Sequence, residues 1–315
     1  MAGYAREAET TIHAQIDFEV PPPDSEPAAL KKSLRVNGVP RPAAEFVGAV
    51  NVVAFAAEDI ELVTGAPSDR RRYLDILISQ TDSVYLRMLQ RFMRVVTQRN
   101  HLLRQVRERR AHEDELDFWD GRLAAEGGAI VDRRRKAVER LLAYAAPAHQ
   151  ELAGVGQRLE IEYLPKLSDQ NVPAPPGSAT ELAGAIARSL KGVRARELAQ
   201  GMSVVGPHRD ELQLTLGGQP AGLFASRGQA RTIALALRLA EASFVEKYTG
   251  RKPVLALDDV LSELDADRRR RVLAAARGYE QTLLTATEFD LVPADFLRTA
   301  RRFTIKAGEI TPEAA

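Results

Sequence analysis

An apolar run that ends in two acidic residues, VLALDDV at positions 254–260, is the first stretch of this sequence able to do chemistry. It predicts a parallel strand with Asp258 and Asp259 at its carboxyl end, the edge at which α/β sheets bind ligands. There Asp258 can support a Mg²⁺ ion whose other ligands are phosphates and water, and Asp259 can orient or deprotonate an attacking water. The simpler interpretation is a strand whose aspartates only cap the next turn.

Two helix starts flank this run. Downstream, a Ser-Glu-Leu-Asp turn ends in Asp265, a natural N-cap for a helix whose arginines at 268–271 are interpreted as a solvated face. Upstream, Ser226, Gly228 and Gln229 open a strongly apolar helix. A hydroxyl, a glycine that allows close approach and the N–H groups of the first turn make an anion site, although an ordinary capped helix start explains the same residues.

Alternating patterns of polar and apolar residues predict the elements that must position these motifs. Before residue 66 the apolar runs are typical of strands, with a hairpin turn at Asn37-Gly38. Residues 67–147 predict two long amphipathic helices that form an antiparallel hairpin, with the second loosened at Gly127-Gly128 and stopped near Pro147. The predicted strands are 11–20, 33–36, 49–55, 159–164, 212–216, 254–257 and 282–285, the predicted later helices are 181–199, 228–248 and 266–277, and 171–180 is a predicted loop.

Composition excludes several classes of protein. The 315 residues contain no cysteine, so disulfides and thiolate metal sites are excluded, and a reducing cytoplasmic location is expected. The sequence contains no run of about 18 apolar residues, so no membrane span is predicted, and the N-terminus has no apolar signal-peptide core. The formal net charge is only +1, so any nucleic-acid binding must come from a local patch.

Such a patch is indicated on the predicted helical hairpin. Residues 69–140 carry 17 Arg and Lys against 12 Asp and Glu, an excess of +5, whereas the rest of the chain is acidic. Phosphate contact is one interpretation, and a merely solvated arginine-rich arm is the other. No sequence-reading motif is present, so any DNA recognition would be of backbone or junction shape.

The order of the motifs resembles the ATPase heads of the ABC and SMC class. SRGQ corresponds to the signature, LDDV to Walker B, SELD to the D-loop and TLLTAT at 282–287 to the switch region. The chain resembles more closely the RecF family of bacterial DNA repair proteins, from about residue 10 to its end. The stretches that carry this resemblance are VVAFAAEDIELVTGAPSDRRRYLD at 52–75, LRMLQRFMRVVTQRNHLLR at 86–104, GPHRDEL at 206–212, SRGQ, and LDDVLSELDADRRR.

The resemblance implies a role for each motif residue. Asp258 would be the Walker B carboxylate for Mg²⁺, and Asp259 the catalytic base. Asp265 would contact the partner across an ATP-bound homodimer. The signature residues Ser226, Gly228 and Gln229 would contact the γ-phosphate of ATP held by the opposite subunit.

Some positions depart from the usual head or carry no assigned chemistry. Thr285 and Thr287 stand where many ABC proteins have a switch histidine, and Ala56-Ala57 replaces a Ser-Pro pair of the family. His208, in GPHRD, is interpreted as a turn-stabilising side chain between two strands.

The fold implied is an α/β P-loop NTPase head of the ABC/SMC type with an inserted α-helical lobe. Residues 1–66 would form the first part of the ATPase lobe. Residues 67–200 would form the mainly helical lobe, and 201–315 the second part of the ATPase lobe, with signature, Walker B and D-loop.

The phosphate loop of such a head has no counterpart in the sequence. It requires Gly-Lys-Ser or Gly-Lys-Thr, and none of the eight lysines follows a glycine. Without that loop Asp258 has no metal to support, part of the sheet is expected to be uncovered, and the chain should bind ATP poorly or not at all. A start codon placed too late is the favoured explanation over a split or decayed gene or a scaffold that has lost ATPase function.

Two functions follow as hypotheses. The resemblance implies a weak DNA-dependent ATPase of replication and recombinational repair, which binds gapped or junction DNA, dimerises with ATP and works with other recombination-mediator proteins. The alternative is a non-hydrolysing scaffold that binds DNA or repair partners without nucleotide.

Overall fold

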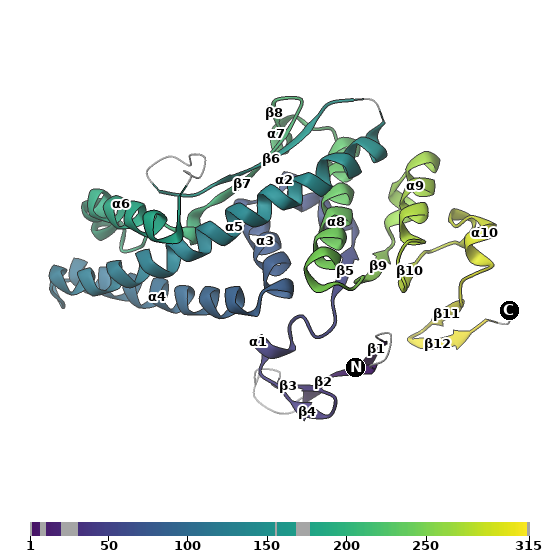
Figure 1. The fold of residues 1–315 in the computed structure, drawn as a ribbon, viewed down its shortest axis with the longest axis horizontal. Helices are drawn as coiled ribbons and strands as arrows, with labels where there is room; N and C mark the ends of the chain where they lie inside the picture. The colour runs from purple at the N-terminus through teal and green to yellow at the C-terminus, as the bar shows by residue number, and fades with distance from the viewer. Residues whose placement is uncertain (1, 7–10, 20–30, 155, 168–176, 314–315) are drawn as a thin grey trace.

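An α/β head carries a helical lobe that projects from it, as the computed structural model shows in Figure 1. The structure describes residues 2–6, 11–19, 31–154, 156–167 and 177–313. The helices there are α1 (Ala43–Phe46), α2 (Glu61–Thr64), α3 (Pro67–Thr81), α4 (Ser83–Arg107), α5 (Leu116–Ala153), α6 (Ala179–Gln200), α7 (Ala221–Phe224), α8 (Arg227–Thr249), α9 (Ala266–Ala276) and α10 (Ala294–Leu297), with 3-10 helices η1 (Ala57–Ile60), η2 (Glu113–Glu115), η3 (Pro207–Arg209), η4 (Val260–Glu263) and η5 (Phe289–Leu291). The strands are β1 (Ala2–Arg6), β2 (Thr11–Glu19), β3 (Lys31–Val36), β4 (Val39–Pro40), β5 (Val52–Phe55), β6 (Leu159–Leu164), β7 (Glu211–Leu216), β8 (Gln219–Pro220), β9 (Val254–Asp258), β10 (Thr282–Thr285), β11 (Phe303–Lys306) and β12 (Glu309–Pro312).

A parallel sheet in the order β10-β9-β5 positions the acidic motif. Its register pairs Val53 with Leu255 and Leu257 with both Phe55 and Leu284, so the strand ends lie at one edge. Buried side chains from alternate positions form one core with side chains of α8, α9 and the end of α5. The predicted strand at 254–257 is therefore confirmed, and its parallel neighbours are residues far apart in the sequence.

The opposite face of this sheet is exposed. Val52 of β5 is 43% exposed and Leu283 of β10 is 56% exposed, whereas Val53 and Phe55 are fully buried. Parallel sheets in α/β proteins are usually covered on both faces, so their strands seldom alternate in this way. An uncovered sheet face is what the sequence predicted for a head without a phosphate-loop helix.

The helical lobe is built on the antiparallel hairpin of α4 and α5, which confirms that prediction. The chain reverses in residues 108–115, where Arg109 adopts a positive φ of 59°. Tyr85 and Phe92 of α4 and Leu123 and Ile130 of α5 are fully buried in the large core that the lobe shares with α3, α6 and α8. The expected helices at 181–199, 228–248 and 266–277 are also present, as α6, α8 and α9.

Two predictions about α5 were wrong. The helix does not stop near Pro147 but continues to Ala153 and ends before Gly154, whose φ is 74°. An internal proline costs about 3 kcal/mol, and the burial of His149 and Leu152 beyond it offsets that cost. Gly127-Gly128 does not loosen the helix either, since α5 is continuous through both residues. Gly128 instead permits close packing of α6, because a Cβ at this position would lie 2.4 Å from the carbonyl oxygen of Ala179.

Antiparallel strands complete the fold. β1 to β4 form a meander whose Asn37-Gly38 turn has the predicted positive φ angles of 52° and 77°. The predicted strands at 159–164 and 212–216 are confirmed as β6 and β7, which form a second sheet with β8. The C-terminal hairpin of β11 and β12 was not predicted. Most of the predicted loop at 171–180 lies outside the described residues. Among the described helices, none combines the length and the apolar character that crossing a membrane requires.

Candidate nucleotide site

Thr285 holds the two aspartates at the end of β9. Its hydroxyl donates to Asp258 Oδ1 at 2.6 Å, and its Oγ1 accepts the backbone N–H of Asp259 at 3.0 Å. The chain turns sharply at Asp259, which has φ 49° and ψ 25°, a region that Asp tolerates better than most residues. The neighbouring parallel strand therefore fixes the acidic motif, a role for Thr285 that the sequence did not reveal.

Both carboxylates keep oxygens for a ligand. Asp258 is exposed and only its Oδ1 accepts a hydrogen bond from another side chain, while Asp259 Oδ1 is buried without a partner. The described residues contain no cluster of three His, Cys, Asp or Glu able to hold a metal ion by themselves. This donor set fits Mg²⁺ that takes one carboxylate and completes its shell with phosphate oxygens and water, as in nucleotide sites.

The signature residues begin α8 with a reciprocal capping box. Ser226 Oγ accepts the N–H of Gln229 at 3.3 Å, and Gln229 Oε1 accepts the N–H of Ser226 at 2.8 Å. The simpler interpretation, a capped helix start, is therefore confirmed for this conformation. A serine hydroxyl has one donor and two acceptor sites, so the cap leaves the Ser226 O–H free to donate to an anion.

Asp265 begins α9 in the same way. Its carboxylate accepts the N–H of Arg268 at 2.9 Å and pairs with the Arg268 guanidinium at 2.9 Å. The hydrogen bond from the Arg268 backbone lowers the pKa of Asp265 below its usual value. A Cβ on Gly228 would lie 3.9 Å from Arg268 Nη1, so the Arg268 guanidinium lies near the start of α8 without a hydrogen bond to it.

The arginines after Asp265 are not simply a solvated face, so that interpretation was wrong. Arg269 donates to the carbonyl oxygens of Leu261 and Leu264, each at 2.8 Å, and Arg271 donates to the carbonyl oxygen of Glu151 at the end of α5. Only Arg270, 72% exposed, fits the prediction. The polar backbone of the tight turn before α9 attracts these guanidinium groups, and spacing on a helix cannot show that.

The motif residues thus form two clusters within one chain. Asp258 and Asp259 lie with Thr285, while the signature residues lie with Asp265 and Arg268. Among the described residues, no hydrogen bond or ion pair joins the aspartate pair to Ser226 or Gln229. Thr287 is exposed, and its side chain makes no hydrogen bond to another described residue that would support a role in either cluster.

The GPHRD segment is a structural centre. Asp210 is 1% exposed and accepts hydrogen bonds from the N–H of Lys166, from Arg134 Nη1 and from the Tyr163 hydroxyl. His208 Nε2 lies 3.2 Å from the carbonyl oxygen of Ser203, which supports the turn-stabilising interpretation. The residues before it form no strand, contrary to the prediction.

Burial lowers the pKa of His208 to about 4. The unfolded chain takes up this proton near pH 6.5 and the folded chain only near pH 4, so the unfolded state binds more protons between these values. This group alone should therefore reduce the free energy of unfolding by up to about 3 kcal/mol as the pH falls from 7 to 4.

Replacement of His208 by Gln keeps an N–H donor for Ser203 and removes the titration. Denaturant unfolding at several pH values should show a shallower acid-side decline for His208→Gln than for the unchanged chain, with the exposed His101→Gln as control. An identical decline in all three proteins would contradict the assignment.

Comparisons with known proteins fit this geometry. The chain is 43% identical over 284 residues to "DNA replication and repair protein RecF" of Herpetosiphon aurantiacus, covering 89% of this chain and 71% of the relative. It is 42% identical over 288 residues to the protein of the same name from Chloroflexus aurantiacus, covering 89% and 72%. A scan against protein-family models found no match.

Two solved structures share the fold. The chain matches a structure of "the recombination mediator protein RecF-ATPrS in RecFOR pathway" with a TM-score of 0.85 and 29% identity, over 99% of this chain and 80% of that one. A second match, described as RecF-ATP in the same pathway, has a TM-score of 0.79 and 32% identity over 90% and 73% of the two chains.

Proposed function

Because the chain belongs to the RecF family of DNA replication and repair proteins, we propose that it binds DNA in an ATP-dependent way as part of recombinational repair. The observation that carries this proposal is the division of the motif residues into two clusters. A nucleotide held by the aspartate cluster of one copy would meet the signature cluster of a second copy. Dimerisation would then follow nucleotide binding.

Each cluster has the chemistry for its half of such a site. Asp258 would hold Mg²⁺, which neutralises phosphate charge when it is bound. Asp259, with its buried unpaired oxygen, would orient or deprotonate water. Ser226, Gly228 and Gln229 would present a hydroxyl and helix N–H groups to the γ-phosphate, and Asp265 would lie at the contact between the two heads.

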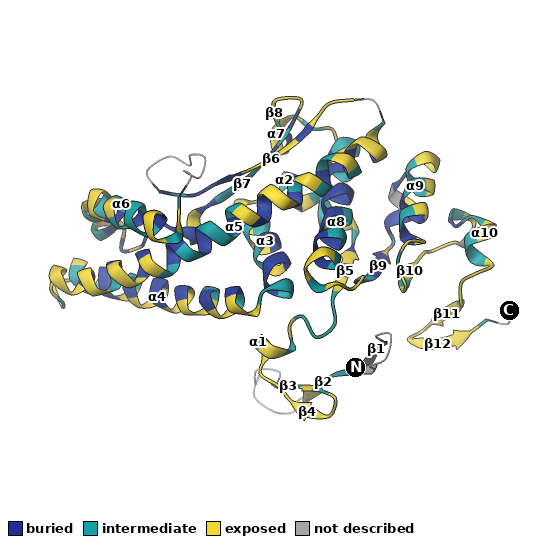
Figure 2. Cartoon of the chain, viewed as in Figure 1, coloured by how far each residue is buried: buried dark blue, intermediate teal, exposed yellow. Residues whose placement is uncertain are grey.

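The DNA surface that we propose is the exposed side of α4. This helix has six arginines and no acidic residue in 25 positions, and all but Arg99 are exposed. Figure 2 shows α4 with much of its outer side coloured as exposed. Arg87, Arg91 and Arg94 share one face at spacings of four and three. This face is largely cationic, although Arg91 also pairs with Glu126 of α5 at 3.0 Å, and without base-reading motifs it suits the phosphates of gapped or junction DNA with no preference for sequence.

The variant Arg87→Gln/Arg91→Gln/Arg94→Gln should weaken binding to gapped duplex DNA by about tenfold to a hundredfold at moderate salt. The slope of log K against log salt should also fall by roughly 0.9 for each lost phosphate contact. Titration of labelled DNA at several salt concentrations measures both quantities.

The control is Lys247→Gln/Arg298→Gln/Lys306→Gln, which removes the same charge from exposed positions on the head. It should change DNA affinity by less than about threefold, since it alters only the long-range field. Equal losses in the two triple variants would argue against a DNA surface on α4.

A scaffold that works without nucleotide is the second candidate, favoured by the absence of any Gly-Lys pair from the sequence. The two candidates differ in one measurement. If ATP and Mg²⁺ leave the DNA affinity of a protein with a complete phosphate loop unchanged, the scaffold is supported and the ATP-dependent function is not.

A further inference from the structure

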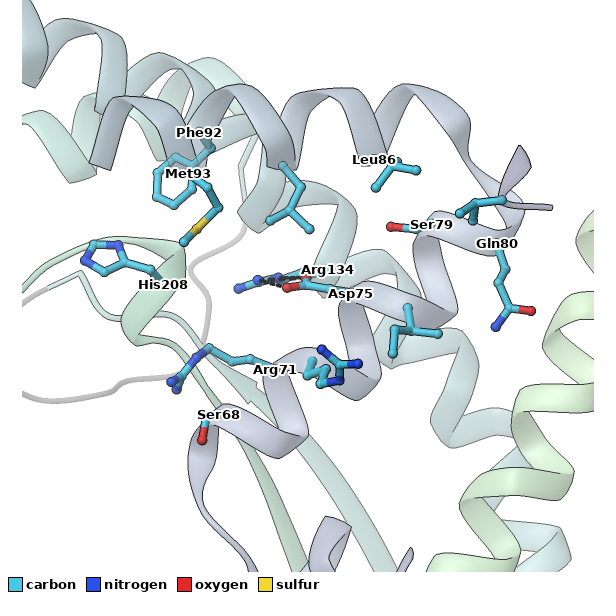
Figure 3. Close-up of a pocket in the computed structure, with 14 residues that line it drawn as sticks. Ser68, Arg71, Asp75, Ser79, Gln80, Leu86, Phe92, Met93, Arg134 and His208 are labelled. Carbon is cyan, nitrogen blue, oxygen red and sulfur yellow. Dashed lines mark hydrogen bonds and ion pairs between the residues drawn. The ribbon is translucent and has the colours of Figure 1, made fainter. Parts of the chain in front are cut away.

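A cavity of about 570 Å³ opens between α3, α4, α5 and the GPHRD turn, outside both motif clusters (Figure 3). This volume lies in the range of ligand-binding pockets and exceeds what a few water molecules need. Its lining divides into an apolar wall and a cationic end, and the proposed nucleotide and DNA functions use neither.

The apolar wall comes mainly from α4. Leu86, Leu89, Phe92 and Met93 line the cavity, and Ile76 of α3 faces it from the other side. Met93 is 46% exposed and Ile76 is 43% exposed, so these side chains offer apolar surface at the opening. Methionine and leucine adapt easily to apolar side chains of a partner.

The cationic end carries arginines whose nearby carboxylates, Asp210 and Glu211, are already paired with Arg134 and Arg70. Within the described chain, no carboxylate lies in ion-pair range of Arg71 or Arg72, while Asp75 in the wall is already paired with Arg134 at 2.8 Å. Arg71 Nη1 donates to the carbonyl oxygen of Asp210 at 2.8 Å. Burial, followed by repulsion from Arg134, lowers the pKa of Arg71, so an anion brought to this end would relieve an unfavourable environment.

His208 adds an unsatisfied polar atom at the same end. Its Nδ1 is buried and has no hydrogen-bond partner. Figure 3 shows His208, Arg71 and Ser68 together at one end of the cavity, with Phe92 and Met93 beside them. Because Nε2 donates to the carbonyl oxygen of Ser203 and the lowered pKa keeps the ring neutral, Nδ1 is an acceptor, which suits a backbone N–H of a bound peptide and not a carboxylate.

We propose that this cavity binds an acidic peptide segment of a partner protein, with carboxylates at Arg71 and Arg72 and an apolar side chain against Met93 and Leu89. Guanidinium groups bind carboxylates in paired hydrogen bonds, which gives the contact strength and direction. A DNA phosphate would satisfy the cations but leave the apolar wall without a partner. The exposed arginines of α4 already offer phosphates a better surface.

The test uses the 315-residue chain and a fluorescein-labelled peptide, Asp-Asp-Leu-Leu-Asp, followed by fluorescence anisotropy. Arg72→Glu should weaken binding by at least about tenfold and Met93→Gln by about fivefold, because one reverses the charge and the other replaces the apolar contact. The matched control is Arg94→Glu, an equal charge change at an exposed position of α4 that does not line the cavity, with an expected change below about twofold.

Two further peptides separate the contributions of charge and apolar contact. Asn-Asn-Leu-Leu-Asn and Asp-Asp-Ser-Ser-Asp should each bind about tenfold more weakly than the first peptide. Binding that does not saturate by about 1 mM, equal binding of the three peptides, or an equal loss in Arg94→Glu would overturn the proposal. A further contradicting result is displacement of the peptide by single-stranded DNA of about 12 nucleotides, if Arg72→Glu weakens binding of the DNA as much as binding of the peptide. The cavity would then be a phosphate site. If Arg72→Glu does not fold, Arg72→Gln provides the same comparison, with a smaller loss of the same sign.

Discussion

Replacement of Arg134 by Met should lower the free energy of unfolding by about 3–5 kcal/mol. Arg134 is 2% exposed and holds Asp75 at 2.8 Å and Asp210 at 3.1 Å, together with the carbonyl oxygen of Pro207 at 2.7 Å. Methionine restores most of the volume but leaves the fully buried Asp210 carboxylate without its cation. Chemical denaturation followed by circular dichroism would show the loss as a lower midpoint.

Two further variants identify the cause of the loss in the free energy of unfolding. Arg122→Met removes an exposed arginine from the same helix and should change stability by less than about 0.5 kcal/mol. Arg134→Met combined with Asp210→Asn should recover part of the loss, because a neutral amide costs less to bury than an unpaired carboxylate. A loss below about 1 kcal/mol in the single variant would show that Arg134 is not the centre of this network.

The second large effect is expected from adding a phosphate loop. An N-terminal strand–loop–helix segment with Gly-x-x-x-x-Gly-Lys-Ser should make the extended protein bind Mg-ATP at least about a hundredfold more tightly than the 315-residue chain. The loop would provide backbone donors for the phosphates, Asp258 would provide the proposed carboxylate for the ion, and the new helix would cover the exposed Val52 and Leu283. Equilibrium titration with a fluorescent ATP analogue measures the gain.

The matched control is the same extension with its loop lysine replaced by alanine, which covers the sheet but loses the main phosphate contact. Asp258→Asn in the extended protein should also lose at least about tenfold in affinity, and only when Mg²⁺ is present. If the extended protein binds ATP no better than its alanine control, the strand end at Asp258 is not half of a nucleotide site.

Local patterns in the sequence predicted much of this molecule. A β-branched apolar run that ends in two acids specifies β9, and apolar stripes at helical spacing specify α4 and α5, because both signals need only neighbouring residues. The capping roles of Ser226 and Asp265 follow for the same reason. The order of the motifs then carried the family resemblance, which implied their roles, and periodicity cannot give those roles.

Long-range partners are what the sequence could not show. Arg99 is one of six arginines in α4, yet it alone is fully buried, because Asp120, Glu197 and Ser203 surround it from distant segments. Likewise, Thr285 reaches Asp258 only because β10 lies beside β9. The continuation of α5 through Pro147 depends on tertiary burial that outweighs a local helix-breaking signal.

The most direct measurement of the central claim is equilibrium binding of Mg-ATP to the 315-residue chain itself. This chain contains the residues proposed for the magnesium and signature halves of an ATP site, and its sequence contains no Gly-Lys pair. We therefore expect binding that does not saturate by about 1 mM. Saturation in the low micromolar range that Asp258→Asn abolishes would contradict this expectation, because the site would then be complete without a phosphate loop.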